Sequence, residues 1–134
     1  MTPRQQILVR HSFAAIRESA VPLALLFYGR LFDLQPRLRG LFPKDLTAQG
    51  QKLMAMFDTI LTSLDQPESL RPQLRELGAR HAALGVQPAD YDTLARAFLW
   101  SLAHALEAAF SPETRDAWQT LLREISSEMQ AGAA

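Results

Sequence analysis

The chain contains no cysteine and has no excess of charge of either sign. The absence of cysteine excludes disulfide bonds, thiol catalysis, iron–sulfur clusters and thiolate-bound zinc. Fourteen Lys and Arg residues balance fourteen Asp and Glu residues, which argues against a nucleic-acid footprint or a polybasic membrane anchor. No apolar run approaches the ~18 residues of a membrane span, and the start MTPRQQILVRHSF lacks the pattern of a secretion signal. We therefore expect a cytoplasmic protein with no nucleic acid and no membrane among its partners.

The short motifs that accompany many enzymatic reactions are also missing. The sequence has no glycine-rich phosphate loop, no His-Glu-x-x-His pair and no serine framed as a nucleophile elbow. It has three histidines only, and His11 and His104 lie off the apolar rows of their segments, so we expect both to be exposed. One remaining inward histidine cannot build a zinc site alone.

Periodicity predicts an all-α protein. Leucine and alanine are abundant, valine and isoleucine are scarce, and no stretch alternates strictly between apolar and polar residues. A chain of 134 residues can bury a sizeable core, and we expect one domain over residues 1–134. Apolar spacing and proline starts predict helices over 3–16, 22–34, 46–64, 71–84, 88–109 and 112–130. Residues 35–45 are expected to form an irregular turn, 65–69 a break, and the terminal AGAA a frayed end.

One histidine interrupts an apolar helical stripe in the segment LRELGARHAALGV, residues 74 to 86. His81 follows Leu74 and Leu77 and precedes Leu84 at spacings of three and four, so all four share the face expected to be buried. A buried imidazole needs a partner for its ring nitrogens. Periodicity alone favours a satisfied core histidine over a metal ligand.

Several segments together resemble the globins. They are LLFYGRLFDLQPRLRGLFP, AQGQKLMAMF, LGARHAALGVQPADY and the AW pair of the last helix, in order and over nearly the whole chain. More narrowly, the set resembles bacterial single-domain globins related to Vitreoscilla-type haemoglobin and the haem domain of flavohaemoglobins. The resemblance implies a three-over-three helical sandwich around haem b, iron protoporphyrin IX. The partners that it implies are the diatomic gases oxygen, carbon monoxide and nitric oxide.

The resemblance assigns roles on one side of the haem. His81 matches the proximal histidine whose Nε2 binds iron, and the carbonyl of Leu77 is the helical acceptor for its other nitrogen. Val86 matches a residue that packs on the porphyrin. Phe42 matches a phenylalanine that stacks on the haem; a core aromatic on a short turn is the alternative. Further pocket lining is expected from Leu31, Met56, Leu84, Tyr91, Leu94 and Phe98.

On the other side, Tyr28 and Gln49 match a distal pair that can donate hydrogen bonds to bound oxygen. The alternatives are a core tyrosine with an ordinary partner and a solvated residue in the first turn of a helix. Leu53 matches the apolar residue that closes the distal pocket. Lys52 and Arg80 match basic positions near the haem propionates, and solvated surface charges are the alternative.

The last helix departs from the flavohaemoglobin pattern. Ala133 stands where relatives keep a glutamate that supports the proximal histidine, Glu128 is out of phase, and Leu122 replaces a tyrosine. Peroxidase-like chemistry is therefore in doubt, and Tyr91 lacks the carboxylate of its network. We expect reversible oxygen binding for transport, storage or delivery. The alternatives are nitric oxide dioxygenation with a separate reductase, gas sensing through a partner, and a helical bundle without haem.

Overall fold

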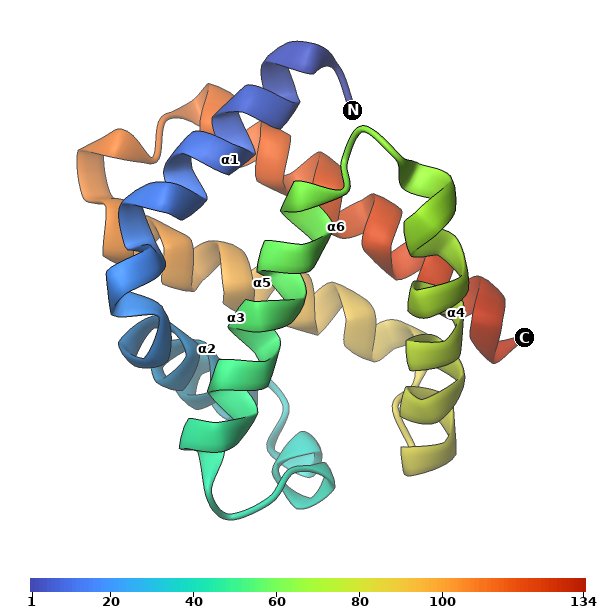
Figure 1. The fold of residues 1–134 in the computed structure, drawn as a ribbon. Coiled ribbons are helices and arrows are strands. Elements are labelled where there is room, and N and C mark those ends of the chain that lie inside the picture. The colour runs from blue at the N-terminus through green and yellow to red at the C-terminus, as the bar shows by residue number, and fades with distance from the viewer.

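The computed structural model describes residues 1–134, and its regular elements are all helical. Six α-helices and three 3-10 helices make up the chain: α1 Pro3–Ile16, η1 Arg17–Ser19, α2 Ala20–Leu34, η2 Pro36–Leu41, α3 Leu46–Thr62, α4 Pro67–Leu84, α5 Pro88–Leu106, η3 Glu107–Ala109 and α6 Pro112–Ala133. One layer holds α1, α3 and α4, and the other holds α2, α5 and α6; in Figure 1, α3 and α4 lie in front of α5 and α6. The predicted all-α, three-over-three sandwich is confirmed.

Helix starts follow the chemistry of their first residues. The side chain of Thr2 accepts a hydrogen bond from the Gln5 N–H, and the Gln5 side chain accepts one from the Thr2 N–H. The Ser111 hydroxyl accepts a hydrogen bond from the Thr114 N–H at 3.2 Å. The backbone N–H of the first helical residue has no partner within the helix, so proline, which lacks that N–H, is well tolerated there. Proline follows Thr2, Gln87 and Ser111 directly.

Several predicted helix ends were wrong by two to four residues. A break was expected over 65–69, whereas α4 begins at Pro67 and accommodates Pro72 inside the helix. The terminal AGAA was expected to fray, whereas α6 continues to Ala133 because Gly132 lies against the main chain of Arg75 in α4. At the second of these ends α4 packs on α6, and a tertiary contact that no local pattern encodes sets the boundary.

The core is one cluster of 27 buried apolar residues, and aromatic rings from five helices meet at its centre. The ring of Phe57 stacks on that of Phe98 with centroids 4.5 Å apart, and Phe98 in turn contacts Trp118 at 5.7 Å. The indole N–H of Trp118 donates to the Ser12 hydroxyl at 2.8 Å, which ties α6 to α1. None of the helices combines the length and apolar character needed to cross a membrane.

The α4–α6 crossing depends on two glycines. A Cβ added at Gly78 would overlap the main chain of Met129, and one added at Gly132 would overlap the main chain of Arg75. Beside them, Glu128 accepts from Arg75 at 3.1 Å and lies 3.6 Å from the Nε of Arg71. The two backbones therefore approach more closely than any side chain would allow, one turn before His81.

Candidate functional site

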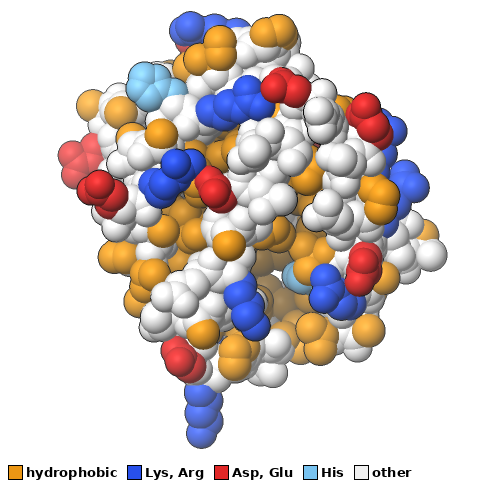
Figure 2. All heavy atoms as spheres, in the orientation of Figure 1, with side chains coloured by type: hydrophobic (Ala, Val, Ile, Leu, Met, Phe, Trp, Pro, Cys, Tyr) orange, Lys and Arg blue, Asp and Glu red, His pale blue; other side chains and the backbone are white.

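A cavity of about 490 Å³, here called the central pocket, opens between α3 and α4. Its walls come from α2 to α6 and are mostly apolar, and the only charged side chains on them are those of Lys52 and Arg80. Figure 2 shows the hollow, with a histidine side chain inside it and a basic side chain on either flank. An apolar cavity with one imidazole and a basic rim is suited to an apolar ligand that carries negative charge at one edge.

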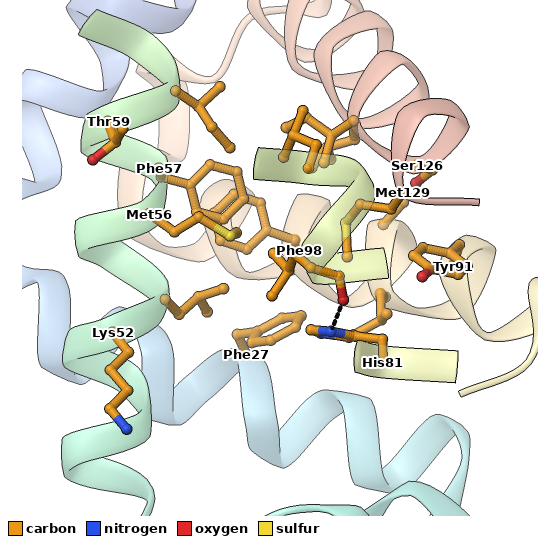
Figure 3. A pocket seen from close by; sticks show the side chains of 18 of the residues that line it. Phe27, Lys52, Met56, Phe57, Thr59, His81, Tyr91, Phe98, Ser126 and Met129 are labelled. Carbon is orange, nitrogen blue, oxygen red and sulfur yellow. Dashed lines mark hydrogen bonds between the residues drawn. The ribbon is translucent and has the colours of Figure 1, made fainter. Parts of the chain in front are cut away.

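His81 is the histidine of this pocket, and α4 fixes its orientation. Its Nδ1 lies 2.8 Å from the carbonyl oxygen of Leu77, one turn earlier (Figure 3). A carbonyl oxygen only accepts hydrogen bonds, so in the neutral ring Nδ1 carries the proton and Nε2 keeps its lone pair. The contact expected from the helical spacing is present. It leaves one nitrogen of a half-buried imidazole free to bind a metal from the pocket side.

The surroundings of His81 favour the neutral ring. Burial lowers its pKa below the ordinary value, the Leu77 carbonyl opposes this shift by accepting from the charged form as well, and the positive charge of Arg80 lowers the pKa further. No aspartate or glutamate lines the pocket to counter these effects. Near neutral pH the imidazole is thus uncharged, which is the state that coordinates a metal.

Tyr28 and Gln49 meet on the opposite wall. The Tyr28 side chain is 1% exposed, and its hydroxyl donates to the main-chain carbonyl of Gln49 at 3.4 Å. Burial raises the pKa of Tyr28 to about 12, and its contact with Gln49 partly opposes the shift, so the phenol stays protonated. The structure therefore brings the predicted pair together. It directs the phenol toward the Gln49 backbone through a long hydrogen bond that another acceptor could replace.

Phe42 lines the pocket directly after η2 and belongs to an aromatic cluster. Its ring centroid is 5.3 Å from that of Tyr28 and 5.5 Å from that of Phe32. The guanidinium of Arg39 lies over the Phe32 ring at 5.3 Å and donates to the carbonyl of Phe42 at 3.3 Å. The two interpretations of Phe42 are compatible, because the same ring packs on the core and faces the pocket.

Most of the other predicted residues also line the pocket. They are Leu53, Met56, Leu77, Tyr91, Leu94 and Phe98, together with Lys52 and Arg80. Burial raises the pKa of Tyr91 as well, so its hydroxyl also stays protonated.

Three predicted residues do not line the pocket. Leu31 is fully buried in the core beneath it. Leu84 was expected to face inward and is 62% exposed, because it ends α4 beyond the point where α6 crosses that helix. Val86 is half-buried after the left-handed turn at Gly85, where its N–H donates to the His81 carbonyl. The helical face was correctly predicted, but the packing partner does not extend to its last turn.

Part of the wall was not predicted from the sequence. The additional lining residues include Phe27, Leu70, Gln73, Leu122, Ser126 and Met129. Leu70 was not predicted because the fourth helix was expected to begin at residue 71, one position after it. The phase of Leu122, four residues after Trp118, was a usable signal for the wall on α6.

The remaining polar residues take no part in the pocket. His11 and His104 are exposed, as expected. Glu128 lies outside the pocket between Arg71 and Arg75, and Ala133 is exposed, so neither supplies a carboxylate to His81. No group of three or more acidic or histidine side chains is arranged to hold a metal ion. Any metal in the pocket must therefore bring most of its own ligands, as the iron of a macrocycle does.

Fold and pocket together define a class of protein, an all-α sandwich around an apolar cavity with one inward histidine. A family model described as Globin matches residues 25–129. The neuroglobin of Tetraodon nigroviridis is 26% identical over 148 aligned residues, covering all of this chain and 93% of that protein. The neuroglobin of Danio rerio is 27% identical with the same coverage. The chain belongs to the globin family, and its fold is the globin fold.

Family membership implies haem and the binding of diatomic gases. The residues present fit that group: apolar walls suit the macrocycle, Lys52 and Arg80 suit its two carboxylates, and the free Nε2 of His81 suits its iron. The narrower resemblance to bacterial globins receives no support from these relatives, which are vertebrate neuroglobins.

Proposed function

We propose that residues 1–134 form a single globin domain that holds haem b and binds oxygen reversibly for transport, storage or delivery. The observation that carries the proposal is the geometry of His81. It is the pocket's only histidine, its Nδ1 donates to a backbone carbonyl, and its Nε2 is free. Haem, when bound, supplies an iron atom at which a diatomic gas can bind. The role of His81 is to hold that iron through a neutral imidazole.

Tyr28 and Gln49 would act on the gas side of the haem. The phenol remains protonated and can exchange its long hydrogen bond to the Gln49 carbonyl for one to a ligand. The Gln49 side chain lines the same wall and can donate from its amide. Two donors in an apolar pocket favour oxygen, which gains negative charge on binding, over carbon monoxide. Leu53, also on this wall, would exclude water.

Lys52 and Arg80 would hold the propionates at the mouth of the pocket. They project from α3 and α4, and both line the cavity. An ion pair at a solvated rim is worth up to ~1 kcal/mol, so these residues would orient the haem more than anchor it. Phe42, beside η2, would supply the larger apolar contact.

Nitric oxide dioxygenation with a separate reductase is the second candidate, favoured by the same polar wall. In this reaction Tyr28 and Gln49 would stabilise the bound oxygen that reacts with nitric oxide. Nitrate formation in steady turnover with a reductase would distinguish the enzyme from a carrier. Gas sensing through a partner is a third candidate, and a ligand-dependent complex would support it. A cytoplasmic location is part of the same proposal.

Visible spectra of the ferric, ferrous and carbon monoxide forms test the proposal. The wild-type chain should bind one haem with a Soret band. His81→Gly should lose haem or hold it loosely, and added imidazole should restore the wild-type spectrum. His11→Ala and His104→Ala are matched controls on exposed histidines and should leave the spectrum unchanged. A normal ferrous spectrum in His81→Gly without imidazole would exclude His81 as the iron ligand.

A further inference from the structure

Asp90 is a buried carboxylate that the proposed gas binding does not use. Its side chain is 4% exposed at the start of α5, next to the pocket residue Tyr91. Its Oδ2 accepts the N–H of Gln87 at 2.8 Å, which caps the helix. A buried carboxylate is costly unless a cation and further hydrogen bonds satisfy it. The helix cap alone does not account for that cost, so the second partner of Asp90 is informative.

That partner is Arg37, which lies on η2 and is 53 residues away in sequence. The Nη2 of Arg37 donates to both carboxylate oxygens of Asp90, at 2.7 and 2.6 Å. Its Nη1 donates to the carbonyl of Gly85 at 3.4 Å, at the end of α4. One guanidinium therefore joins η2, the residue that ends α4 and the first turn of α5. Because the guanidinium is planar, donation through Nη2 to Asp90 and through Nη1 to Gly85 fixes its orientation as well as its distance from both.

Pocket residues lie on both sides of this link. Phe42 lines the pocket directly after η2, and Arg39 donates to the carbonyls of Phe42 and Pro43, so hydrogen bonds tie this segment to η2. On the other side, His81 lies one turn before Gly85 in α4. The element that η2 packs against most is α2. Arg37 therefore supplies the hydrogen bonds that join the Phe42 wall to the His81 wall.

We propose that Arg37 and Asp90 form a clamp that holds η2 against the α4–α5 turn and thereby slows the release of haem. The inference rests on the proposed function, in which haem occupies the central pocket. Arg37 and Asp90 are positioning residues, because they act through Phe42 and His81 rather than by touching the ligand. Opening the clamp lets the two walls separate without unfolding the helices.

Haem transfer from the ferric holoprotein to excess apomyoglobin measures the release rate. Arg37→Met and Asp90→Asn should each release haem on the order of tenfold faster, the scale expected for losing a charged hydrogen bond. The double variant should be no faster than the single variants, because each substitution breaks the same contact. Arg17→Met and Asp58→Asn are matched controls: their 2.8 Å pair is more than half exposed, and neither residue lines the central pocket. They should release haem at the wild-type rate.

Hydrogen exchange of the holoprotein supplies a readout that general destabilisation would not reproduce. Loss of the clamp should speed exchange of amides in residues 36–42 and 85–91 and leave those of α6 unchanged. If Arg37→Met does not fold, Arg37→Lys keeps the charge without the fork and should release haem at an intermediate rate. Wild-type release in the Arg37 and Asp90 variants, or exchange accelerated equally throughout, would overturn the proposal. A wild-type chain that binds no haem would instead refute the proposed function, and exchange in 36–42 would still test the clamp.

Discussion

Replacing Gly78 by alanine should disturb both the stability of the fold and the position of His81. A Cβ there would overlap the main chain of Met129, and backbone cannot rotate away as a side chain can. To restore ordinary contact distances, α4 and α6 must separate by on the order of 1–2 Å. Overpacking of this kind costs about 1–3 kcal/mol, and it acts one turn before the proposed iron ligand.

Gly29→Ala is the matched control, because nothing lies within 4 Å of a Cβ at Gly29 in α2. Alanine is favoured over glycine inside a helix by up to ~1 kcal/mol, so this variant should be slightly more stable than wild type. Gly78→Ala should be less stable despite the same gain in helix propensity. Because the propensity gain is common to both variants, they should differ by the overpacking cost alone, roughly 1–3 kcal/mol in the free energy of unfolding.

Urea unfolding and resonance Raman spectroscopy test the two consequences separately. Unfolding midpoints of both variants give the difference in stability, and the iron–histidine stretching frequency reports the position of the proximal imidazole. Gly78→Ala should shift or broaden that band, and Gly29→Ala should leave it unchanged. Equal midpoints and identical bands in the two variants would refute the close crossing of α4 and α6 and its influence on His81.

Three further results are expected. Tyr28→Phe should raise the oxygen off-rate about tenfold, the lower end of the effect expected for a charged hydrogen bond. The lower end applies because the phenol must first break its hydrogen bond to the Gln49 carbonyl. An unchanged off-rate in stopped-flow measurements would contradict this donor role. The iron–histidine frequency of wild type should resemble that of an oxygen-storage globin, and Glu128→Gln should not change it. Because burial lowers the pKa of His81, the unfolded chain takes up the proton first, near the reference histidine pKa of about 6.5. The urea midpoint of the apoprotein should therefore fall as the pH drops through that value, less steeply in His81→Gln.

Local chemistry predicted much of the fold. The prolines after Thr2, Gln87 and Ser111 mark true helix starts, and the phase of His81 correctly indicated its contact with Leu77. The same spacing incorrectly predicted that Leu84 is buried. Periodicity identifies a helical face, but it carries no information on how far the neighbouring helix covers that face.

Contacts between distant residues account for most of what was missed. Gly78 and Gly132 are 54 positions apart, and each lies against the main chain of the opposite helix. The need for a glycine at either position is therefore evident only once the two helices are placed together. Read singly, Arg37 and Asp90 are ordinary surface charges, since most such residues are exposed. Their pairing follows from the path of the chain between η2 and α5, which no short motif records. The unpredicted residues thus fix distances between helices, whereas those predicted from the sequence face the pocket itself.

That division has a physical origin in how a cofactor site is made. The groups that touch a ligand must have particular chemistry, so imidazole, phenol and amide can be recognised in the sequence at His81, Tyr28 and Gln49. The groups that hold those side chains apart need only the right shape or charge at the right place, and many sequences satisfy that need. Gly78 allows a close helix crossing because it has no side chain, and Arg37 positions its neighbours through hydrogen bonds from its guanidinium. Substitutions at such positions should therefore change haem retention and the geometry of the iron ligand while the pocket keeps every residue that defines it.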